Sequence, residues 1–335
     1  MKLKKSQLAT FALLSLVFLF YNTLDYHGVR AFLQVSEPKI VDLTGLPDIP
    51  VLKSKLKSSE LKPANKVQPK IPTPNELEAS ISAQSVLVYD ITSGTPLIAQ
   101  ASNQPLAPAS TTKLMTALVA LETYSPETLL KFAPSDFRFG FNHDFKVGEE
   151  LTVKDLITAM LVESANEAAF NLARNHPQKE AGFVKRMNEK AKELGLKNTH
   201  FTNPAGFDNP DHYSTADDLN LLAIKATENP LLKEVVKLKK AEIADFSRRI
   251  KHQVTSTNKL LLYNPQVIGV KTGTTPGAKE VLITQFKDDD KVIQVIVLGS
   301  DDRYEDTLSL FSAVKNHYQW LNPVELVRLG IEMIN

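Results

Sequence analysis

The hydrophobic and polar positions from residue 81 onward predict strands at both ends of a folded region, with helices between them. Short β-branched runs predict strands at 86–90, 97–100, 267–271, 281–286 and 292–298. Apolar residues at helical spacing predict helices at 110–122, 153–163, 167–174, 183–194, 216–228 and 307–321. Tight turns join the late strands, so we expect a largely antiparallel sheet. The pattern predicts a mixed α+β fold with an inserted helical lobe, and a cleft between the lobes is the expected place for a site.

An apolar segment precedes this region. Residues 6–24 carry no charge and come after Lys2, Lys4 and Lys5, and their number is close to the roughly 20 that a membrane helix needs. Lysines at this place favour a cytoplasmic N-terminus and export of the rest of the chain. We therefore expect residues 1–24 to be a single-pass anchor with an extracytoplasmic domain behind it. The alternative is a cleaved signal sequence and a secreted protein.

The composition changes between the apolar segment and the folded region. Seven prolines and seven lysines lie between residues 37 and 74, which predicts an extended, semi-rigid spacer within a linker over residues 25–80. The folded domain is expected over 81–321 and a tail over 322–335. A net charge of +1 argues against nucleic acid as a partner. The absence of cysteine excludes disulfides, cysteine nucleophiles and thiolate metal sites.

The first segment with candidate chemistry is Pro-Ala-Ser-Thr-Thr-Lys at 108–113, which opens a predicted helix. Residues three apart on a helix lie on one face, so Ser110 and Lys113 can approach each other. A serine hydroxyl becomes a good nucleophile when a neighbouring base takes its proton, and a lysine can be that base when desolvation lowers its pKa. Taken alone, the serine is more often a helix cap.

Two further segments carry polar groups toward the same predicted cleft. Ser164 and Asn166 stand at a junction between two predicted helices. Lys-Thr-Gly-Thr at 271–274 ends a predicted strand, where a lysine and two hydroxyls can bind a carboxylate. The glycine of this segment lets the backbone come close to a ligand. Each segment alone is more often an ordinary helix junction or surface turn.

Together and in this order, the three segments match the Ser-x-x-Lys, Ser-x-Asn and Lys-Thr-Gly set of penicillin-binding proteins and serine β-lactamases. The chain most resembles the low-molecular-mass D-alanyl-D-alanine carboxypeptidases. The resemblance extends over about residues 81–321 through Asn-Thr-His-Phe at 198–201, Asn-Pro-Ala-Gly-Phe at 203–207, His-Tyr-Ser-Thr-Ala at 212–216 and Thr-Asn-Lys-Leu-Leu at 257–261. It implies a five-stranded antiparallel sheet flanked by helices, with an inserted helical lobe.

The resemblance also implies an activity and a set of site residues. It implies removal of the terminal D-alanine from peptidoglycan stem peptides through a Ser110 acyl-enzyme, without cofactor or metal, and covalent inhibition by β-lactams. The implied catalytic residues are Ser110, Lys113 and Ser164, and the implied substrate-binding residues are Asn166, Lys271, Thr272, Gly273 and Thr274. The segment 275–280 departs from the usual Ala-Gly continuation of the family, so the strand edge that meets substrate is expected to differ.

Several alternatives share part of this pattern. DD-endopeptidases and transpeptidases use the same fold and motifs. A class A β-lactamase needs Glu-x-x-Leu-Asn after the second motif; Glu193 and Leu196 have the spacing, but Lys197 comes directly after them. A metallopeptidase is disfavoured because the histidines form no ligand pair with a carboxylate at helical spacing, and His200 and His212 are expected to pack and to bond loops. An inactive wall-binding module is the non-enzyme alternative.

Overall fold

The computed structural model describes residues 68–69, 81–138 and 144–321. The chain divides into two units, Met1–Lys62 and Pro63–Asn335, and every described residue belongs to the second. The predicted anchor at 1–24, nearly all of the linker at 25–80 and the tail at 322–335 lie outside the described residues. Within the described ranges, no helix has the length and apolar character needed to cross a membrane.

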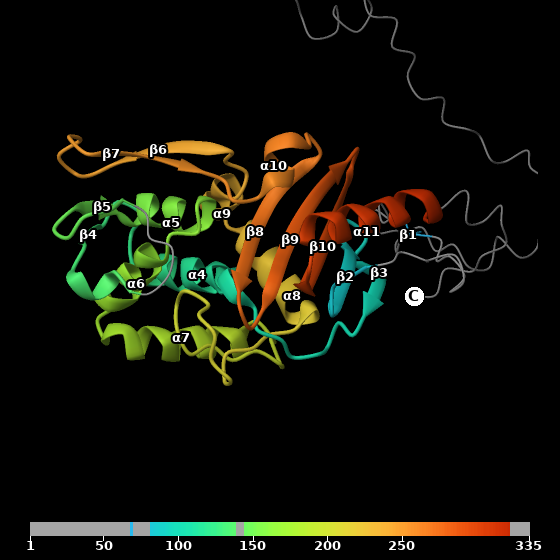
Figure 1. Ribbon diagram of the computed structural model, residues 1–335, viewed down its shortest axis with the longest axis horizontal. Coiled ribbons are helices and arrows are strands. Elements are labelled where there is room, and N and C mark those ends of the chain that lie inside the picture. Colours follow the sequence, from blue (N-terminus) through green and yellow to red (C-terminus); the bar gives the residue numbers. More distant parts are fainter. Residues whose placement is uncertain (1–67, 70–80, 139–143, 322–335) are drawn as a thin grey trace, which may run out of the picture. The chain divides into compact units, whose positions relative to one another are not determined.

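The centre of the fold is a five-stranded antiparallel sheet with the strand order β3-β2-β10-β9-β8 (Figure 1). The strands span Thr95–Gln100 (β3), Ser85–Asp90 (β2), Lys291–Ser300 (β10), Lys279–Asp288 (β9) and Val267–Thr275 (β8). This confirms the predicted sheet, with each strand extended by one to several residues. β8 comes last in the strand order, beside β9, and is therefore an edge strand.

Hydrophobic side chains are buried on both faces of this sheet. In β2, Leu87 belongs to one core while its neighbours Val86 and Val88 belong to the other. This alternation is expected when successive side chains point to opposite faces of a strand. Helix α11, Arg303–His317, packs on β9 and β10 on one side, and α8, Ala216–Glu228, packs on β2 and β10.

The helical lobe is built around α4, Lys113–Thr123, which is buried along most of its length. Contacts to α4 come from α5 (Val153–Val162), α6 (Asn166–Asn175), α7 (Lys179–Glu193) and α8. The lobe confirms the predicted inserted helices. Four other elements were not predicted: the hairpin strands β4 (Leu129–Lys131), β5 (Glu150–Thr152), β6 (Lys240–Ala244) and β7 (Lys251–Thr255). The short helices α9 (Pro230–Val235) and α10 (Lys259–Tyr263) were also not predicted.

The predicted final helix at 307–321 was wrong at both ends. Helix α11 begins at Arg303 because the Asp302 side chain accepts hydrogen bonds from the backbone N–H groups of Tyr304 and Glu305, which is the usual role of an N-cap aspartate. The helix ends at His317, and Tyr318 is extended. Residues Trp320–Leu321 then form the strand β11, which pairs with Gln68–Pro69, the strand β1.

Candidate active site

The candidate nucleophile lies in a short turn before α4. Ser110 belongs to the 3-10 helix η3, Ala109–Thr112, so the α-helix predicted from residue 110 starts three residues later, at Lys113. Two glycines, Gly206 and Gly273, allow the backbone of two other segments to pack closely against this turn. A Cβ atom on Gly206, where φ is +87°, would lie 1.9 Å from the Ala109 carbonyl oxygen. A Cβ atom on Gly273 would lie 2.9 Å from the Ser110 nitrogen, so β8 runs directly beside the nucleophile.

Lys113 makes the contact that the sequence predicted. Its Nζ atom donates hydrogen bonds to Ser110 Oγ at 2.7 Å, to Asn166 Oδ1 at 2.8 Å and to the Ala205 carbonyl oxygen at 2.9 Å. The side chain is fully buried, and this burial lowers the pKa of Lys113 from 10.5 to about 7, against the opposing effect of Glu167. A neutral amine is therefore available near pH 7.

The neutral form of Lys113 has the geometry of a base. A neutral amine keeps two N–H donors and one lone pair. The Asn166 amide oxygen and the Ala205 carbonyl oxygen only accept hydrogen bonds, so they hold the two remaining donors. The lone pair is then left for the third partner, the Ser110 hydroxyl. This arrangement prepares Ser110 to lose its proton to Lys113.

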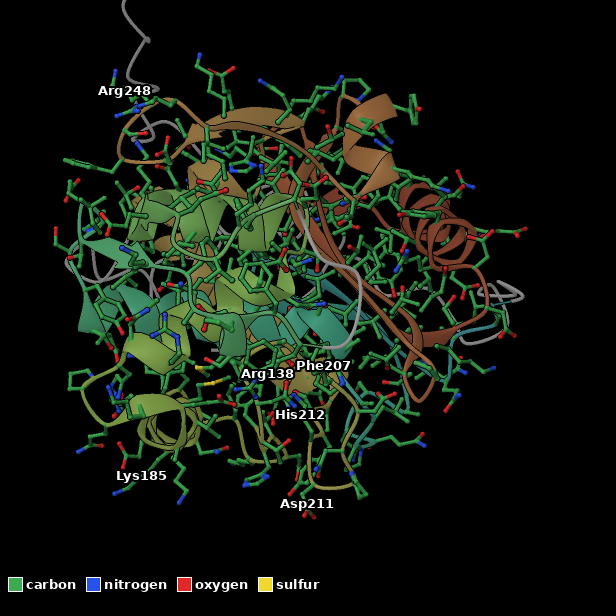
Figure 2. The ribbon with its side chains drawn as sticks, turned by 60° about the vertical axis from the view of Figure 1, so that its left-hand side comes forward. Arg138, Lys185, Phe207, Asp211, His212 and Arg248 are labelled. Atoms are coloured by element: carbon green, nitrogen blue, oxygen red, sulfur yellow. The ribbon has the colours of Figure 1, made fainter. Side chains whose placement is uncertain are left out.

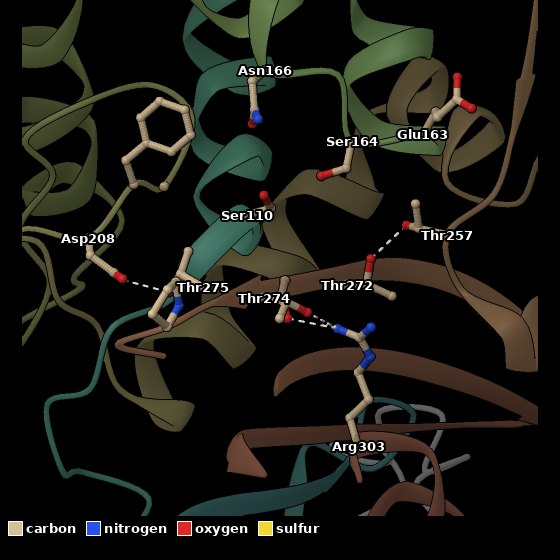
Figure 3. A pocket seen from close by; sticks show the side chains of 14 residues that line it. Ser110, Glu163, Ser164, Asn166, Asp208, Thr257, Thr272, Thr274, Thr275 and Arg303 are labelled. Carbon is tan, nitrogen blue, oxygen red and sulfur yellow. Dashed lines mark hydrogen bonds between the residues drawn. The ribbon is translucent and has the colours of Figure 1, made fainter. Parts of the chain in front are cut away.

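The second motif lies across the cleft from the sheet. Ser164 falls between α5 and α6 and adopts φ +67°, a left-handed conformation that is uncommon for a residue with a side chain. Its hydroxyl points into the cleft, on the same side as Ser110 (Figure 3). Asn166 is the first residue of α6 and lines the cleft while its Oδ1 atom holds Lys113. The structure therefore brings the first and second motifs together.

The third motif lies on the edge strand β8. Thr272, Gly273 and Thr274 line the cleft, and the Thr272 hydroxyl is 2.6 Å from the Thr257 hydroxyl. Lys271 is buried behind them and donates to the Thr272 carbonyl oxygen at 3.0 Å. Burial, and after it the positive charges of Lys113 and Arg303, hold the pKa of Lys271 well below its usual value. Lys271 is thus suited to give up a proton, but it is not among the residues that line the cleft.

Among the described residues, the cation that does line the cleft is Arg303, which the sequence analysis missed. Its Nη1 atom donates to the Thr274 hydroxyl at 2.7 Å and to the Gly273 carbonyl oxygen at 2.8 Å. Arg303 is the first residue of α11, 29 residues beyond Thr274 in the chain. No motif links these two positions, and the predicted start of the last helix at 307 left Arg303 outside it.

The loop after α7 also supports the turn that carries the nucleophile. Thr202 N–H donates to Nδ1 of His212 at 3.1 Å, so the ring hydrogen is on Nε2, which donates to the Thr112 hydroxyl at 2.9 Å. Burial lowers the pKa of His212 to about 4, and the ring is neutral at pH 7. His200 contacts the Asp211 carbonyl oxygen at 2.6 Å. Both histidines therefore form hydrogen bonds within loops, as the sequence analysis expected.

These elements enclose a cleft of about 510 Å³ between the helical lobe and β8 (Figure 3). Ser110, Ser164 and Asn166 lie on its helical side, and β8 forms the opposite wall. The cleft combines an activated hydroxyl, a second serine, the edge of a strand and a guanidinium. Such a set can attack a carbonyl group next to a carboxylate and form an acyl-enzyme.

Comparisons with known proteins agree with this geometry. The family described as D-alanyl-D-alanine carboxypeptidase matches residues 70–302. The carboxypeptidase DacF of Bacillus subtilis is 34% identical over 232 residues, which are 67% of this chain and 59% of DacF. A D-alanyl-D-alanine endopeptidase of Pseudomonas aeruginosa is 31% identical, over 68% of this chain and 74% of that protein. The crystal structure of a Streptomyces DD-transpeptidase superposes with a TM-score of 0.67 at 27% identity, over 71% of this chain and 97% of the other.

The family match and the fold assign the chain to a class of proteins. The family match covers most of the described residues, including all three motif segments, and the structural match covers 71% of this chain. The resemblance stated from the motifs and the expected five-stranded fold are both confirmed. This protein therefore belongs to the D-alanyl-D-alanine carboxypeptidase family, whose members are serine peptidases.

Proposed function

We propose that this protein is a D-alanyl-D-alanine carboxypeptidase that acts on peptidoglycan stem peptides through a Ser110 acyl-enzyme. The observation that carries the proposal is the 2.7 Å contact between Ser110 Oγ and the Lys113 amine, whose pKa burial lowers to about 7. The chain spans 59% of the length of DacF. The carboxypeptidase activity named for DacF therefore supports the proposal by similarity.

The mechanism begins with attack on the carbonyl of the penultimate D-alanine. Ser110 Oγ forms a bond to the carbonyl carbon as its proton passes to the neutral Lys113 amine. The backbone N–H of Ser110 and an N–H of β8 near Thr274 are the proposed donors to the oxyanion, because β8 lies directly against the turn that carries Ser110. The tetrahedral intermediate then collapses and the C–N bond to the terminal D-alanine breaks.

The leaving amine needs a proton before it departs. We assign this transfer to Ser164. Its hydroxyl gives a proton to the amine and regains the proton that Lys113 took from Ser110, directly or through Lys271, whose lowered pKa keeps it from retaining that proton. Lys113 is then neutral again. Asn166 and the β8 edge hold the peptide on the acyl side. Water then hydrolyses the ester, and Lys113 again serves as the base. Penicillins are expected to acylate the same serine, since their lactam carbonyl takes the place of the peptide carbonyl.

The product analysis tests this proposal. Purified protein is incubated with a monomeric muropeptide pentapeptide and an excess of an amine acceptor, and the products are identified by mass spectrometry. We expect free D-alanine and a tetrapeptide, with little cross-linked dimer. Dimer as the main product would make the protein a transpeptidase. Cleavage of cross-linked dimers without D-alanine release from monomers would make it an endopeptidase, the activity named for the Pseudomonas relative.

Arg303 is expected to recognise the terminal carboxylate of the substrate. A guanidinium that already donates to Thr274 leaves other N–H groups for a carboxylate, together with the Thr274 hydroxyl. We expect Arg303→Met to lower kcat/KM about 10- to 100-fold, the range for loss of a hydrogen bond to a charged group. The comparison substrate is the same peptide with an amidated C-terminus, which should change little. Equal losses on both peptides would assign Arg303 a structural role instead.

A further inference from the structure

The two ends of the cleft carry opposite charges. Arg303 lies at one end together with Thr257 and Thr272, and Asp208 lies at the other end beside Thr275 (Figure 3). Glu163 also lines the cleft, but its carboxylate points away from Ser110 in Figure 3. In Figure 3, Ser110 lies between Asp208 and Arg303. A substrate that fits both ends therefore has a negative group beyond one side of its reacting carbonyl and a positive group beyond the other.

Asp208 is held in place but keeps room for a ligand. Its Oδ1 atom accepts from the Thr275 hydroxyl at 2.5 Å, and Oδ2 accepts from the Gly277 N–H at 2.9 Å. A carboxylate offers about four acceptor sites, so both oxygens still have capacity. The side chain is exposed at the cleft, and no lysine or arginine in the described part of the chain forms a salt bridge with it. An amine of the substrate is a chemically suitable partner.

The turn that holds Asp208 is the segment where this chain departs from the family pattern. Residues 275–280 contain the end of β8, a turn and the start of β9, and the hydrogen bonds from Thr275 and Gly277 fix the carboxylate beside that turn. A Cβ atom on Gly277 would lie 3.0 Å from the Asp208 carboxyl group. The close approach of backbone and carboxylate therefore depends on this glycine.

The direction of a bound peptide is set by the same positions. In Figure 3, the Arg303 guanidinium lies on the Thr272 side of Ser110, and Thr275 and Asp208 lie on the other side. With the terminal carboxylate at Arg303 and the reacting carbonyl at Ser110, the acyl half therefore extends along β8 toward Thr275. Gly273 lies against Ser110, and Thr275 is two residues, or about 7 Å, further along the strand. The residue before the D-alanyl-D-alanine unit therefore reaches the Asp208 end of the cleft. In peptidoglycan stem peptides this residue is a diamino acid.

We propose that Asp208 binds the free side-chain amine of the diamino acid that precedes the D-alanyl-D-alanine unit. The preferred substrate class is then a stem peptide in which this amine is neither acylated nor cross-linked. This inference rests on the proposed function, because it needs the peptide to lie in the cleft with its carboxylate at Arg303.

Two synthetic peptides test the inference. Nα-acetyl-L-lysyl-D-alanyl-D-alanine has a free ε-amine, and its Nα,Nε-diacetyl counterpart does not. We expect the native protein to release D-alanine from the free amine with a kcat/KM about three- to fivefold higher, as for a partly exposed ion pair. The ratio should fall toward one in Asp208→Asn and also in the native protein as the salt concentration rises.

The matched control is Asp211→Asn, which removes the same charge from the same loop. Asp211 is exposed, lies at the outer end of the loop in Figure 2 and is not among the residues that line the cleft. Its variant should keep the native ratio. A ratio of one in the native protein, a ratio that survives in Asp208→Asn at low salt, or an equal fall in both variants would overturn the inference.

Binding is measured separately from hydrolysis. Each peptide is used to protect Ser110 from labelled penicillin, which reports occupancy of the cleft even when neither peptide is cleaved. Stronger protection by the free amine in the native protein, lost in Asp208→Asn, would support the inference even if the carboxypeptidase activity itself failed. Equal protection by the two peptides would reject amine recognition, whatever the outcome for catalysis.

Discussion

Replacement of Ser110 by alanine is expected to abolish covalent labelling by penicillin and to reduce D-alanine release by more than about 10⁴-fold, the order of loss for an activated nucleophile. Ser110 is the hydroxyl in the cleft that contacts an amine with a pKa near 7. The Thr257 and Thr272 hydroxyls bond each other, and the Thr274 hydroxyl accepts from a guanidinium. Intact-protein mass spectrometry and peptide mapping measure the adduct and its position.

The control for this result is the folding of the variant. Ser110 is partly exposed in the cleft, so loss of its hydroxyl is expected to leave the thermal unfolding temperature nearly unchanged. An adduct that persists in Ser110→Ala, on Ser164 or elsewhere, would contradict the assignment of the nucleophile. An adduct on Ser110 in the native protein without D-alanine release would keep the nucleophile and reject the carboxypeptidase reaction.

Replacement of Lys113 by methionine is expected to slow acylation by about 10²- to 10⁴-fold, the usual contribution of a general base. Methionine has a similar length and suits the fully buried position, so the variant tests loss of the amine with little loss of packing. The matched control is Lys192→Met, which removes a lysine from the exposed surface of α7. Acylation of Lys113→Met at the native rate would assign the base to another group.

The pH dependence of the native protein tests the same base independently. Burial lowers the pKa of Lys113 to about 7, and the amine takes a proton only when it is neutral. Acylation of Ser110 is therefore expected to rise as the pH increases through about 7 and to level off above it. Stopped-flow measurement of penicillin acylation gives this profile. A rate that falls over the same range would mean that the protonated amine is the active form.

Much of the fold was predictable because its strands and helices produce local patterns of hydrophobic and polar residues in the sequence. β-Branched runs predicted the five strands, and helical spacing predicted the lobe around α4. The elements that were missed are short, such as the hairpin of β6 and β7. In β6 only Ile243 is buried, and in β7 the buried residues are His252 and Val254, so the hydrophobic alternation over five residues is weak. The two strands depend on the lobe against which they pack.

The sequence also determined which residues form the chemical core of the site. Ser110 and Lys113 are one helical turn apart, so local geometry alone places the amine near the hydroxyl. The order of the three motifs then indicated the family and, through it, the roles of Ser164, Asn166 and the segment 271–274. Those roles remain predictions.

Only the tertiary structure decided the electrostatics and the two ends of the cleft. The pKa of Lys113 depends on burial by segments far along the chain, such as the loop that places the carbonyl oxygen of Ala205, 92 residues away, on its amine. Arg303 and Asp208 belong to no motif, and each enters the cleft because distant elements pack against β8. Local spacing determines neighbours along one helix or strand, whereas desolvation and charge placement depend on the packing of the whole domain.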